Sequence, residues 1–455
     1  MSGVAARPLP DWAPDAADVF RRVEDAARAM VEGLAAVAPG RLVSLSVTLP
    51  ATLAPAGNEL GGDTRWLPPD GGTSLHGAGA AARYLGDDVR AFDREREGWC
   101  VLGDGTPPVA FFTVPPATEA PTATLWVPRV LVRHDPSRLT ITLSARRGTE
   151  DASSWPRQWS GELREVLEPA SPPAAAGPVG IVDLAASPAP EVWRARVTAA
   201  RSAIAAGRLD KVVLARRLDA RLAGPVDEAG LMRRLARLYP GCHVLALPHG
   251  AGRVVAATPE RLVRKRGDEL VSHALAGTAA RRGEPVEDAR AAAALLGSAK
   301  ERQEHDLVVS AIVAAMAGMC TRVAHDPAPS VLELRHVQHL WTRVRGRLRD
   351  ELGLLDAVAR LHPTPAVLGA PGAAARRWLA AQGERRDSLY SGVAGWLDQR
   401  GDGDAMVVLR SVYLEADRAV LWAGAGIVAG SEPAAELAET DLKLRTMLEV
   451  LDGAR

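Results

Sequence analysis

The sequence predicts an α+β fold built on largely antiparallel sheets. Segments with helical and with strand-like patterns are mixed along the chain, without the strict strand–helix–strand alternation that a parallel sheet requires. Several strand-like segments follow one another directly across short turns, which is typical of antiparallel hairpins. With 455 residues, the chain is long enough for two or three domains or lobes.

Residues 1–170 predict an N-terminal lobe of helix plus antiparallel strands. Apolar residues recur at helical spacing over 14–37, and RLVSLSVTLP (41–50) then alternates like a strand. PVAFFTV, TATLWVPRVLV and LTITLSA, within 108–143, are predicted as further strands separated by Pro, Asp and Ser turns. A second helix is expected over 157–167.

A segment rich in Pro, Ala and Gly, PASPPAAAGPVG (169–180), predicts a linker to a second region, 171–455. Unusual motifs are dense in this region. Its expected elements are, in order, a helix (190–206), a strand that begins at Lys211, a helix (227–238), strands in CHVLALP, RVVAAT and ERLVRKRGDELVSHALA, two helices (286–296 and 299–319), a strand in RHVQHLWTRVRG, a helix, the Pro-rich loop LHPTPAVLGAPG, a helix, three strands and a closing helix (433–451).

Composition argues against several classes of partner. Lys plus Arg and Asp plus Glu number 55 each, so no net charge favours nucleic acid or an anionic membrane. The first residues lack the apolar core of a signal peptide, and runs such as 311–319 are too short to span a bilayer. Three scattered cysteines, Cys100, Cys242 and Cys320, indicate reduced thiols rather than disulfides or a zinc site. We expect a cytoplasmic protein that binds neither nucleic acid nor membrane.

Lys211 stands where a predicted buried strand, VVLA, begins. One explanation is structural, because a lysine at the mouth of a strand can lay its stem on apolar surface and keep its ammonium in water. The other is catalytic, because burial disfavours the charged form and a neutral amine can act as a base. The local pattern leaves both explanations open.

Two predicted helices each carry a pair of carboxylates three residues apart. The pairs are Glu301 with Glu304 in SAKERQEHDLVV, and Glu436 with Glu439 in SEPAAELAETDLKLRTML. This spacing places both members of a pair on one helical face, where they can converge on one point. Either pair alone is typical of a solvated charged face. Two such pairs, without zinc-type ligands around them, favour a hard cation such as Mg²⁺.

Glycine-dense segments predict places where the backbone approaches a ligand. AGAGIVAGSEP (423–433) is predicted as a turn before the closing helix and LAGT (275–278) as a second turn, and amides in such turns can bind an anion. Arg410, in VVLRS, is predicted on a strand, where it either holds a ligand carboxylate or forms a structural ion pair. His339, in VQHL, is either a polar wall of a pocket or a satisfied core histidine.

Nine segments occur in an order that is far more specific than any one of them. They are KVVLARR, TPERLVRK, ALAGTAARRG, ERQEHDLVV, HVQHLWTRVRG, HPTPAVLGAP, LYSGVAGWLD, AMVVLRS and AGAGIVAGSEPAAELAETDLKLRTML. Together they resemble the chorismate-utilising enzyme family, and within it the isochorismate synthases of the menaquinone type, over residues 185–452. The resemblance implies an α/β sandwich of two sheets with outer helices, and an active site with one Mg²⁺ between the sheets.

The resemblance also implies roles for particular residues. Lys211 corresponds to the base that activates water, and Glu260, in TPERL, corresponds to the general acid. The implied Mg²⁺ ligands are Glu304 and Glu439, with Glu301 and Glu436 binding directly or through water. The implied substrate pocket consists of Gly277, Thr278, His339, Ala366, Tyr390, Arg410, Gly424, Ala425, Gly426 and Lys443.

The implied activity is conversion of chorismate into isochorismate, by addition of water at C2 and loss of the hydroxyl at C4. Hydroxide leaves poorly, so Glu260 needs a raised pKa, and burial is expected to keep the Lys211 amine neutral for its work on water. Mg²⁺ would hold the ring carboxylate of this dianion. Arg410 and amides of the glycine-dense turn would hold its second carboxylate.

Other members of the family are the nearest alternatives. Anthranilate and aminodeoxychorismate synthases take ammonia from a glutaminase partner and generally lack a lysine at this position, so Lys211 argues against them. Salicylate synthases keep the lysine and then eliminate pyruvate. Ala366 favours the simple isomerase, since salicylate synthases tend to carry threonine there. Outside the family, a non-catalytic binder of aromatic carboxylates would need neither Lys211 nor Glu260, and a scaffold would leave the carboxylate pairs without a purpose.

Three positions depart from the family pattern. Ala299 replaces a frequent aspartate, His273 a frequent acidic residue, and Leu368, near the pocket, a frequent glycine. The resemblance implies a monomer or weak homodimer without a glutaminase subunit, whose partner is the small molecule chorismate. Its product would feed menaquinone, siderophore or other salicylate-derived biosynthesis.

Overall fold

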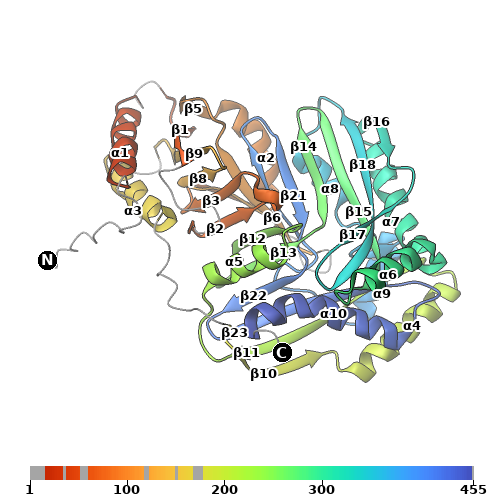
Figure 1. Ribbon diagram of the computed structural model, residues 1–455. Coiled ribbons are helices and arrows are strands. Elements are labelled where there is room, and N and C mark those ends of the chain that lie inside the picture. Colours follow the sequence, from red (N-terminus) through yellow and green to blue (C-terminus); the bar gives the residue numbers. More distant parts are fainter. Residues whose placement is uncertain are drawn as a thin grey trace.

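The computed structural model describes residues 16–33, 37–51, 60–116, 122–148, 152–167 and 178–452. Most of the predicted linker at 169–180 lies outside these residues. Two sheets form the body of the molecule, with helices on their outer faces (Figure 1). Among the described strands, every pairing is antiparallel except that of β1 (Leu42–Pro50) with β5 (Cys100–Gly103), which agrees with the predicted α+β class.

The first sheet contains thirteen strands within the described residues. Its order from edge to edge is β10 (Ile181–Ser187), β11 (Lys211–Leu222), β23 (Arg418–Ile427), β22 (Ser411–Glu415), β13 (Gly252–Thr258), β12 (His243–His249), β2 (Thr64–Leu67), β3 (Ser74–Ala78), β8 (Val130–His134), β9 (Arg138–Arg146), β1 and β5, with β19 (Gly369–Ala370) paired to β11.

The second sheet contains ten strands within the described residues. Its order is β16 (Cys320–His325), β18 (Val337–Leu348), β15 (Glu269–Ala280), β14 (Arg261–Arg266), β21 (Gly403–Val407), β20 (Val393–Asp398), β6 (Val109–Val114), β7 (Thr124–Val127) and β4 (Ala82–Leu85), with β17 (Ser330–Glu333) paired to β18. Strands from both sides of residue 170 pair in each sheet, as β2 does with β12 and β6 with β20.

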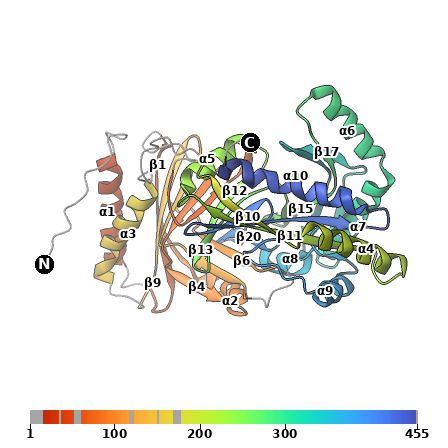
Figure 2. The ribbon, with the colours of Figure 1, turned by 90° about the horizontal axis from the view of Figure 1, so that it is seen from below.

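Helices cover the outer faces of both sheets (Figures 1 and 2). They are α1 (Ala16–Gly33), α2 (Asp88–Glu95), α3 (Trp155–Leu167), α4 (Pro190–Ala205), α5 (Glu228–Leu238), α6 (Pro285–Gly297), α7 (Ala299–Ala317), α8 (Leu354–Leu361), α9 (Gly372–Ala381) and α10 (Pro433–Asp452). Apolar clusters join α1 and α3 to β1, β8 and β9, α4 and α9 to β11 and β23, α5 and α10 to the middle of the first sheet, and α7 and α8 to the second sheet. No helix in the described part of the chain is long and apolar enough to cross a membrane.

Local sequence explains how α7 and α10 begin beside the space between the sheets. The Ser298 hydroxyl accepts a hydrogen bond from the amide of Glu301 and thereby caps α7. Val308, Ile312 and Met316 follow at intervals of one helical turn and are buried against the second sheet. Pro433 opens α10, where its missing N–H leaves no helical hydrogen bond unmade. The first turns of both helices are therefore free to present polar side chains to the site.

Two of the points at which the chain passes from one sheet to the other are neighbours in space. The chain crosses between β13 and β14 at Glu260, and between β21 and β22 at Arg410. The crossings are hydrogen-bonded to each other: Val407 N donates to Glu260 O at 3.0 Å, and Ala257 N donates to Arg410 O at 3.0 Å. Two polar residues distant in sequence are thus brought to one point between the sheets.

The structure differs from the sequence prediction in several elements. TATLWVPRVLV forms two strands, β7 and β8, which separate at Pro128 and belong to different sheets. Four strands, not three, precede the closing helix, because the chain breaks at Arg410 instead of running through it. Arg410 is therefore not on a strand. The elements β2, β3, β4, β5 and α2 were not predicted, and neither were β10, β16 and β17.

Candidate active site

A pocket lies between the two sheets beside the crossings. Most residues predicted from the sequence line it: Glu260, Gly277, Thr278, Glu304, His339, Ala366, Tyr390, Arg410, Gly424, Gly426 and Lys443. The other predicted residues, which do not line it, are Lys211, Ala425, Glu301, Glu436 and Glu439.

Glu260 lies at the first crossing with only 5% of its surface exposed. Burial raises the pKa of its carboxyl to about 7, although the charges of Lys211 and Lys443 act in the opposite direction. A carboxyl with this pKa holds its proton in a large share of molecules near neutral pH. It is therefore suited to donate a proton to a group in the pocket.

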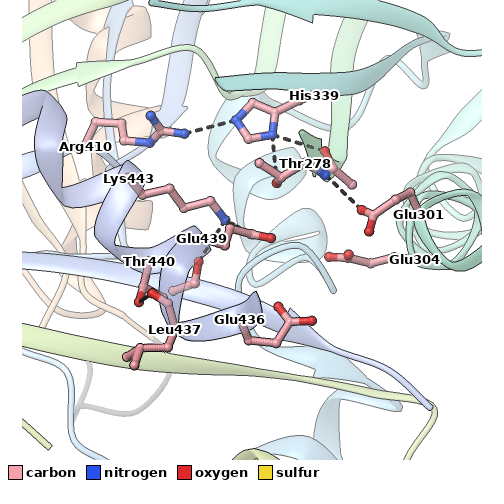
Figure 3. A network of polar contacts seen from close by, with 12 residues as sticks. Thr278, Glu301, Glu304, His339, Arg410, Glu436, Leu437, Glu439, Thr440 and Lys443 are labelled. Carbon is pink, nitrogen blue, oxygen red and sulfur yellow. Dashed lines mark hydrogen bonds and ion pairs between the residues drawn. The ribbon is translucent and has the colours of Figure 1, made fainter. Parts of the chain in front are cut away.

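Arg410 lies at the second crossing with φ of 49°, a left-handed conformation that is uncommon for arginine. Its Nη2 lies 3.0 Å from Nε2 of His339. Nδ1 of His339 lies 3.2 Å from both the carbonyl of Gly277 and the hydroxyl of Thr278. Since Arg410 can only donate, Nε2 accepts and the ring proton is on Nδ1. Burial, then the charges of Arg410 and Lys443, hold the pKa of His339 well below 6.5, and the neutral ring orients the guanidinium (Figure 3).

The segment LAGT (275–278) forms a β-bulge inside β15 rather than the predicted turn. The pairing register of β15 with β18 shifts between Ala276 and Thr278, and Gly277 has φ of 77°. A Cβ at Gly277 would lie 3.3 Å from Glu301, so glycine permits close approach of the strand to α7. The amide of Thr278 then donates to Oε2 of Glu301 at 2.9 Å. The bulge therefore holds Glu301 next to the pocket wall.

The glycine-dense segment 423–433 is half strand, since β23 continues to Ile427. A Cβ at Gly426 would clash with the carboxylate of Glu304 and lie 2.7 Å from Cε of Lys211. Gly426 is therefore needed because two functional side chains lie over the strand, and not because a turn requires it.

Ala425, predicted in the pocket, does not reach it. Side chains alternate across a strand, so the neighbours of Gly424 and Gly426 point to the other face. Ala425 is completely buried there with Ile427, in the apolar cluster that includes α4 and α9.

Lys211 is the first residue of β11 and is completely buried. Its Nζ lies 2.9 Å from Oε1 of Glu304. Burial by itself raises the pKa of Glu304, but the charge of Lys211, helped by Lys443 and Lys300, outweighs this effect and lowers the pKa below its usual value. The sequence predicted an amine kept neutral by burial. The structure adds the Glu304 carboxylate as the partner of this amine, and its neutrality stays a prediction.

The four carboxylates predicted to bind metal extend from α7 and α10 toward the same space (Figure 3). Nζ of Lys300 lies 3.2 Å from Oε1 of Glu301 and 2.9 Å from Oε1 of Glu436. Lys443 donates to Oε1 of Glu439 at 2.5 Å. Burial raises the pKa of Glu301 and of Glu436, and a neighbouring carboxylate raises each further. A lysine therefore meets every carboxylate of the cluster.

The cluster is chemically suited to a hard cation, because its donors are carboxylate oxygens from two facing helices. Ammonium groups already lie against these oxygens, which indicates where positive charge is favourable. Within the described ranges, no group of three His, Cys, Asp or Glu side chains is arranged to hold a metal ion. Binding of Mg²⁺ therefore stays a prediction, and would require the carboxylates to exchange their lysine partners.

Trp422 lines the pocket but was not singled out in the sequence. Its ring stacks on Tyr390 with centroids 5.6 Å apart and an interplanar angle of 11°. Its Nε1 donates to Asp387 at 3.2 Å, and the guanidinium of Arg217 lies 5.9 Å from its ring centroid. Alternation along the strand could have identified it, because Trp422 shares the face of Gly424.

Two sheets with a pocket between them are the architecture of a known class of enzymes. Residues 109–452 match a family model described as "Chorismate binding enzyme". This chain belongs to the chorismate-binding enzyme family, which confirms the resemblance inferred from the sequence. The matched stretch includes every residue predicted for the site.

Two curated relatives are isochorismate synthases. The chain is 43% identical over 261 residues to the salicylate biosynthesis isochorismate synthase of Pseudomonas aeruginosa, a match that covers 57% of this chain and 55% of the relative. It is 36% identical over 272 residues to isochorismate synthase DhbC of Bacillus subtilis, covering 58% of this chain and 68% of the relative. The match thus spans about half the length of the Pseudomonas relative.

Solved structures support the same fold. The menaquinone-specific isochorismate synthase MenF of Escherichia coli aligns with a TM-score of 0.78 at 26% identity, covering 94% of this chain and 99% of that one. Anthranilate synthase component I of Streptococcus pneumoniae TIGR4 aligns with a TM-score of 0.63 at 24% identity, covering 84% and 81%. The second likeness concerns the fold alone.

Proposed function

We propose that this protein is an isochorismate synthase, which adds water to C2 of chorismate and releases the hydroxyl from C4. The observation that carries the proposal is that Glu260 lines the inter-sheet pocket and that Lys211 lies at its border, next to Gly426 and Glu304. The side chain of Lys211 lies over Gly426, which lines the pocket, and its charge acts on the Glu260 carboxyl. A protein that only binds an aromatic carboxylate needs neither a base nor an acid there.

Lys211 is the residue that takes a proton from water in this proposal. It can accept one only as the free amine, so its ion pair with Glu304 must open first. Once the pair opens, the Lys211 nitrogen no longer has the Glu304 carboxylate as its partner and can contact a water molecule. In this proposal Lys211 acts as the base only after the carboxylate has been withdrawn.

Glu260 donates its proton to the departing hydroxyl, which would otherwise leave as hydroxide. The carboxyl can hold that proton near neutral pH because burial raises its pKa to about 7. A well-placed acid or base contributes about 10²–10⁴-fold each to the rate.

The two carboxylates of chorismate would be held at different sides of the pocket. Arg410, oriented by neutral His339, is placed to bind one of them through paired N–H groups. Glu304 and Glu439, with Glu301 and Glu436 nearby, would hold Mg²⁺, which when bound supplies Lewis-acid attraction for the ring carboxylate. Trp422 and Tyr390, whose rings stack, form an aromatic part of the pocket lining.

Salicylate synthase is the second candidate, because Thr278 and Tyr390 in the pocket suit that activity as well. The Pseudomonas relative is itself named for salicylate biosynthesis. Salicylate formation would add elimination of pyruvate after the same hydration. Ala366 lines the pocket and favours the simple isomerase.

The experiment that tests the proposal is product analysis by chromatography after incubation of the purified protein with chorismate and MgCl₂. Isochorismate as the main product is expected. Salicylate and pyruvate in equal amounts would favour the second candidate instead. Tight binding of chorismate without turnover would contradict both and would indicate a non-catalytic binder.

A further inference from the structure

Lys300 has no part in the proposed reaction, yet it lies inside the carboxylate cluster. It is the second residue of α7 and is not among the described residues that line the pocket. Its Nζ lies 2.9 Å from Glu436 of α10 and 3.2 Å from Glu301 of its own helix. One ammonium is thus shared by two carboxylates that come from different helices.

Local structure does not favour a lysine at this position. The first turn of a helix is the positive end of its dipole, where an anion is stabilised and a cation is not. Glu301 and the Ser298 cap suit this turn, whereas Lys300 does not. The turn before α10 also lies against the lysine stem, since a Cβ at Gly430 would be 3.5 Å from Cγ of Lys300. The ion pairs with Glu436 and Glu301, and not the helix dipole, therefore hold the ammonium in place.

The lysines divide the cluster into two halves. In one half, Lys211 meets Glu304 and Lys443 meets Glu439, and Lys443 and Glu304 line the pocket. The other half, around Lys300, does not line the pocket, and its buried carboxylate Glu436 has only 2% of its side chain exposed. Carboxylates from two facing helices can hold two divalent ions side by side in other proteins. Here an ammonium occupies the half in which a second ion would bind.

We propose that Lys300 is a built-in counter-cation that takes the place of a second divalent ion, so that the cluster binds one ion, at Glu304 and Glu439. This inference rests on the metal centre of the proposed function, but not on the identity of the substrate or product. Lys300 also joins the first turns of α7 and α10 through its two ion pairs. It is therefore a positioning residue and not a catalytic one.

The test is the number of Mn²⁺ ions bound per full-length chain, measured without substrate by isothermal titration calorimetry and by the EPR signal of free Mn²⁺. We expect one ion on the wild-type chain and two on Lys300→Met. Lys300→Arg keeps the charge and serves as the matched control, with one ion expected. One ion on Lys300→Met, or two on the wild-type chain, would overturn the proposal.

Lys300→Met leaves Glu436 buried without a partner, so its folding is checked by near-ultraviolet circular dichroism. If the variant is unfolded without metal, Mn²⁺ should restore the native spectrum at two ions per chain, and failure to do so counts against the proposal. Absence of any Mn²⁺ binding to the wild-type chain would remove the metal centre of the proposed function and this inference with it. One ion on the wild-type chain and one on Lys300→Met would refute the role of Lys300 and leave the metal centre of the proposed function unaffected.

Discussion

The ammonium nitrogen of Lys211 lies 2.9 Å from a carboxylate oxygen of Glu304, and the two side chains are 0% and 11% exposed. The pair joins the first residue of β11 to the second turn of α7 across the end of the pocket. A Cβ on Gly426 would collide with the carboxylate and approach the lysine stem. Only glycine therefore leaves room for the pair at this position of β23. The proposed base is therefore stored as an ion pair, and catalysis requires that pair to open.

The first prediction concerns this pair. Lys211→Met leaves the Glu304 carboxylate buried without its partner, and we expect a loss of about 3–5 kcal/mol in the free energy of unfolding. The double variant Lys211→Met/Glu304→Gln removes both charges and should recover most of that loss. Urea unfolding in EDTA measures both values. Equal stability of wild type and the single variant would show that the pair is not formed in the folded protein.

Turnover separates the catalytic role of Lys211 from its structural role. Lys211→Met should lower kcat by about 10²–10⁴-fold while chorismate binding remains measurable by calorimetry. The stability-restoring double variant should remain inactive. Recovery of activity together with stability would contradict the assignment of Lys211 as the base.

The pKa of Glu260 predicts how the activity depends on pH. Its carboxyl has a pKa of about 7 because of burial, and the protonated form is the proposed acid. The value of kcat/KM should therefore fall as the pH rises above about 7. Glu260→Gln should lose about 10²–10⁴-fold in kcat and lose this alkaline limb. A wild-type profile that stays flat from pH 6 to 9 would exclude this carboxyl as the acid.

Glu260 also predicts a pH dependence of stability in the metal-free protein. Its pKa is about 7 in the folded chain, against an ordinary value of 4.5, so between these values the folded chain holds a proton that the unfolded chain has lost. Stability should therefore decrease as the pH rises through this window, by about 3 kcal/mol in total. Urea unfolding at pH 5 and pH 8 should show this decrease for the wild type and a smaller one for Glu260→Gln.

His339 is predicted to act on binding and not on proton transfer. His339→Leu removes the acceptor that orients Arg410, and we expect KM for chorismate to rise about 10- to 100-fold with a smaller change in kcat. Because the pKa of His339 lies well below 6.5, its ring does not titrate near pH 6.5 in the folded protein. The pH–activity profiles of the wild type and the variant should therefore have the same shape in this region. His325→Leu, at an exposed position on β16, is the control. A larger effect on kcat than on KM would argue for a direct role in the reaction.

Two glycines at the two ends of one segment give a matched pair of variants. Gly426→Ala places a Cβ against Glu304 and Lys211, and we expect a loss of more than about 100-fold in kcat/KM, the effect of displacing reacting groups by about 1 Å. Gly430→Ala meets nothing closer than 3.5 Å and should retain activity. Similar losses in both variants would indicate that the segment needs glycine for flexibility and not for close contact.

Local patterns in the sequence were sufficient for most helices and for the site motifs. The spacing of Val308, Ile312 and Met316 predicts α7, and the three-residue spacing of Glu301 and Glu304 places both carboxylates on one of its faces. Short strands with weak patterns, such as β2 to β5, were missed because their burial depends on the neighbouring strands in the sheet. TATLWVPRVLV was predicted as a single strand, because only the tertiary structure separates it at Pro128 into two sheets.

By itself, the sequence determined the α+β class, the family, and the residues that carry charge and polarity in the site. Only the tertiary structure decided that Lys211 meets Glu304 and that Arg410 meets His339. It also brought Lys300, which the sequence analysis had not singled out, to Glu436. The reason is physical. Spacing along a helix or strand sets the face on which a side chain lies, whereas the partner across that face depends on how the two sheets pack and on the close approaches that Gly277 and Gly426 allow.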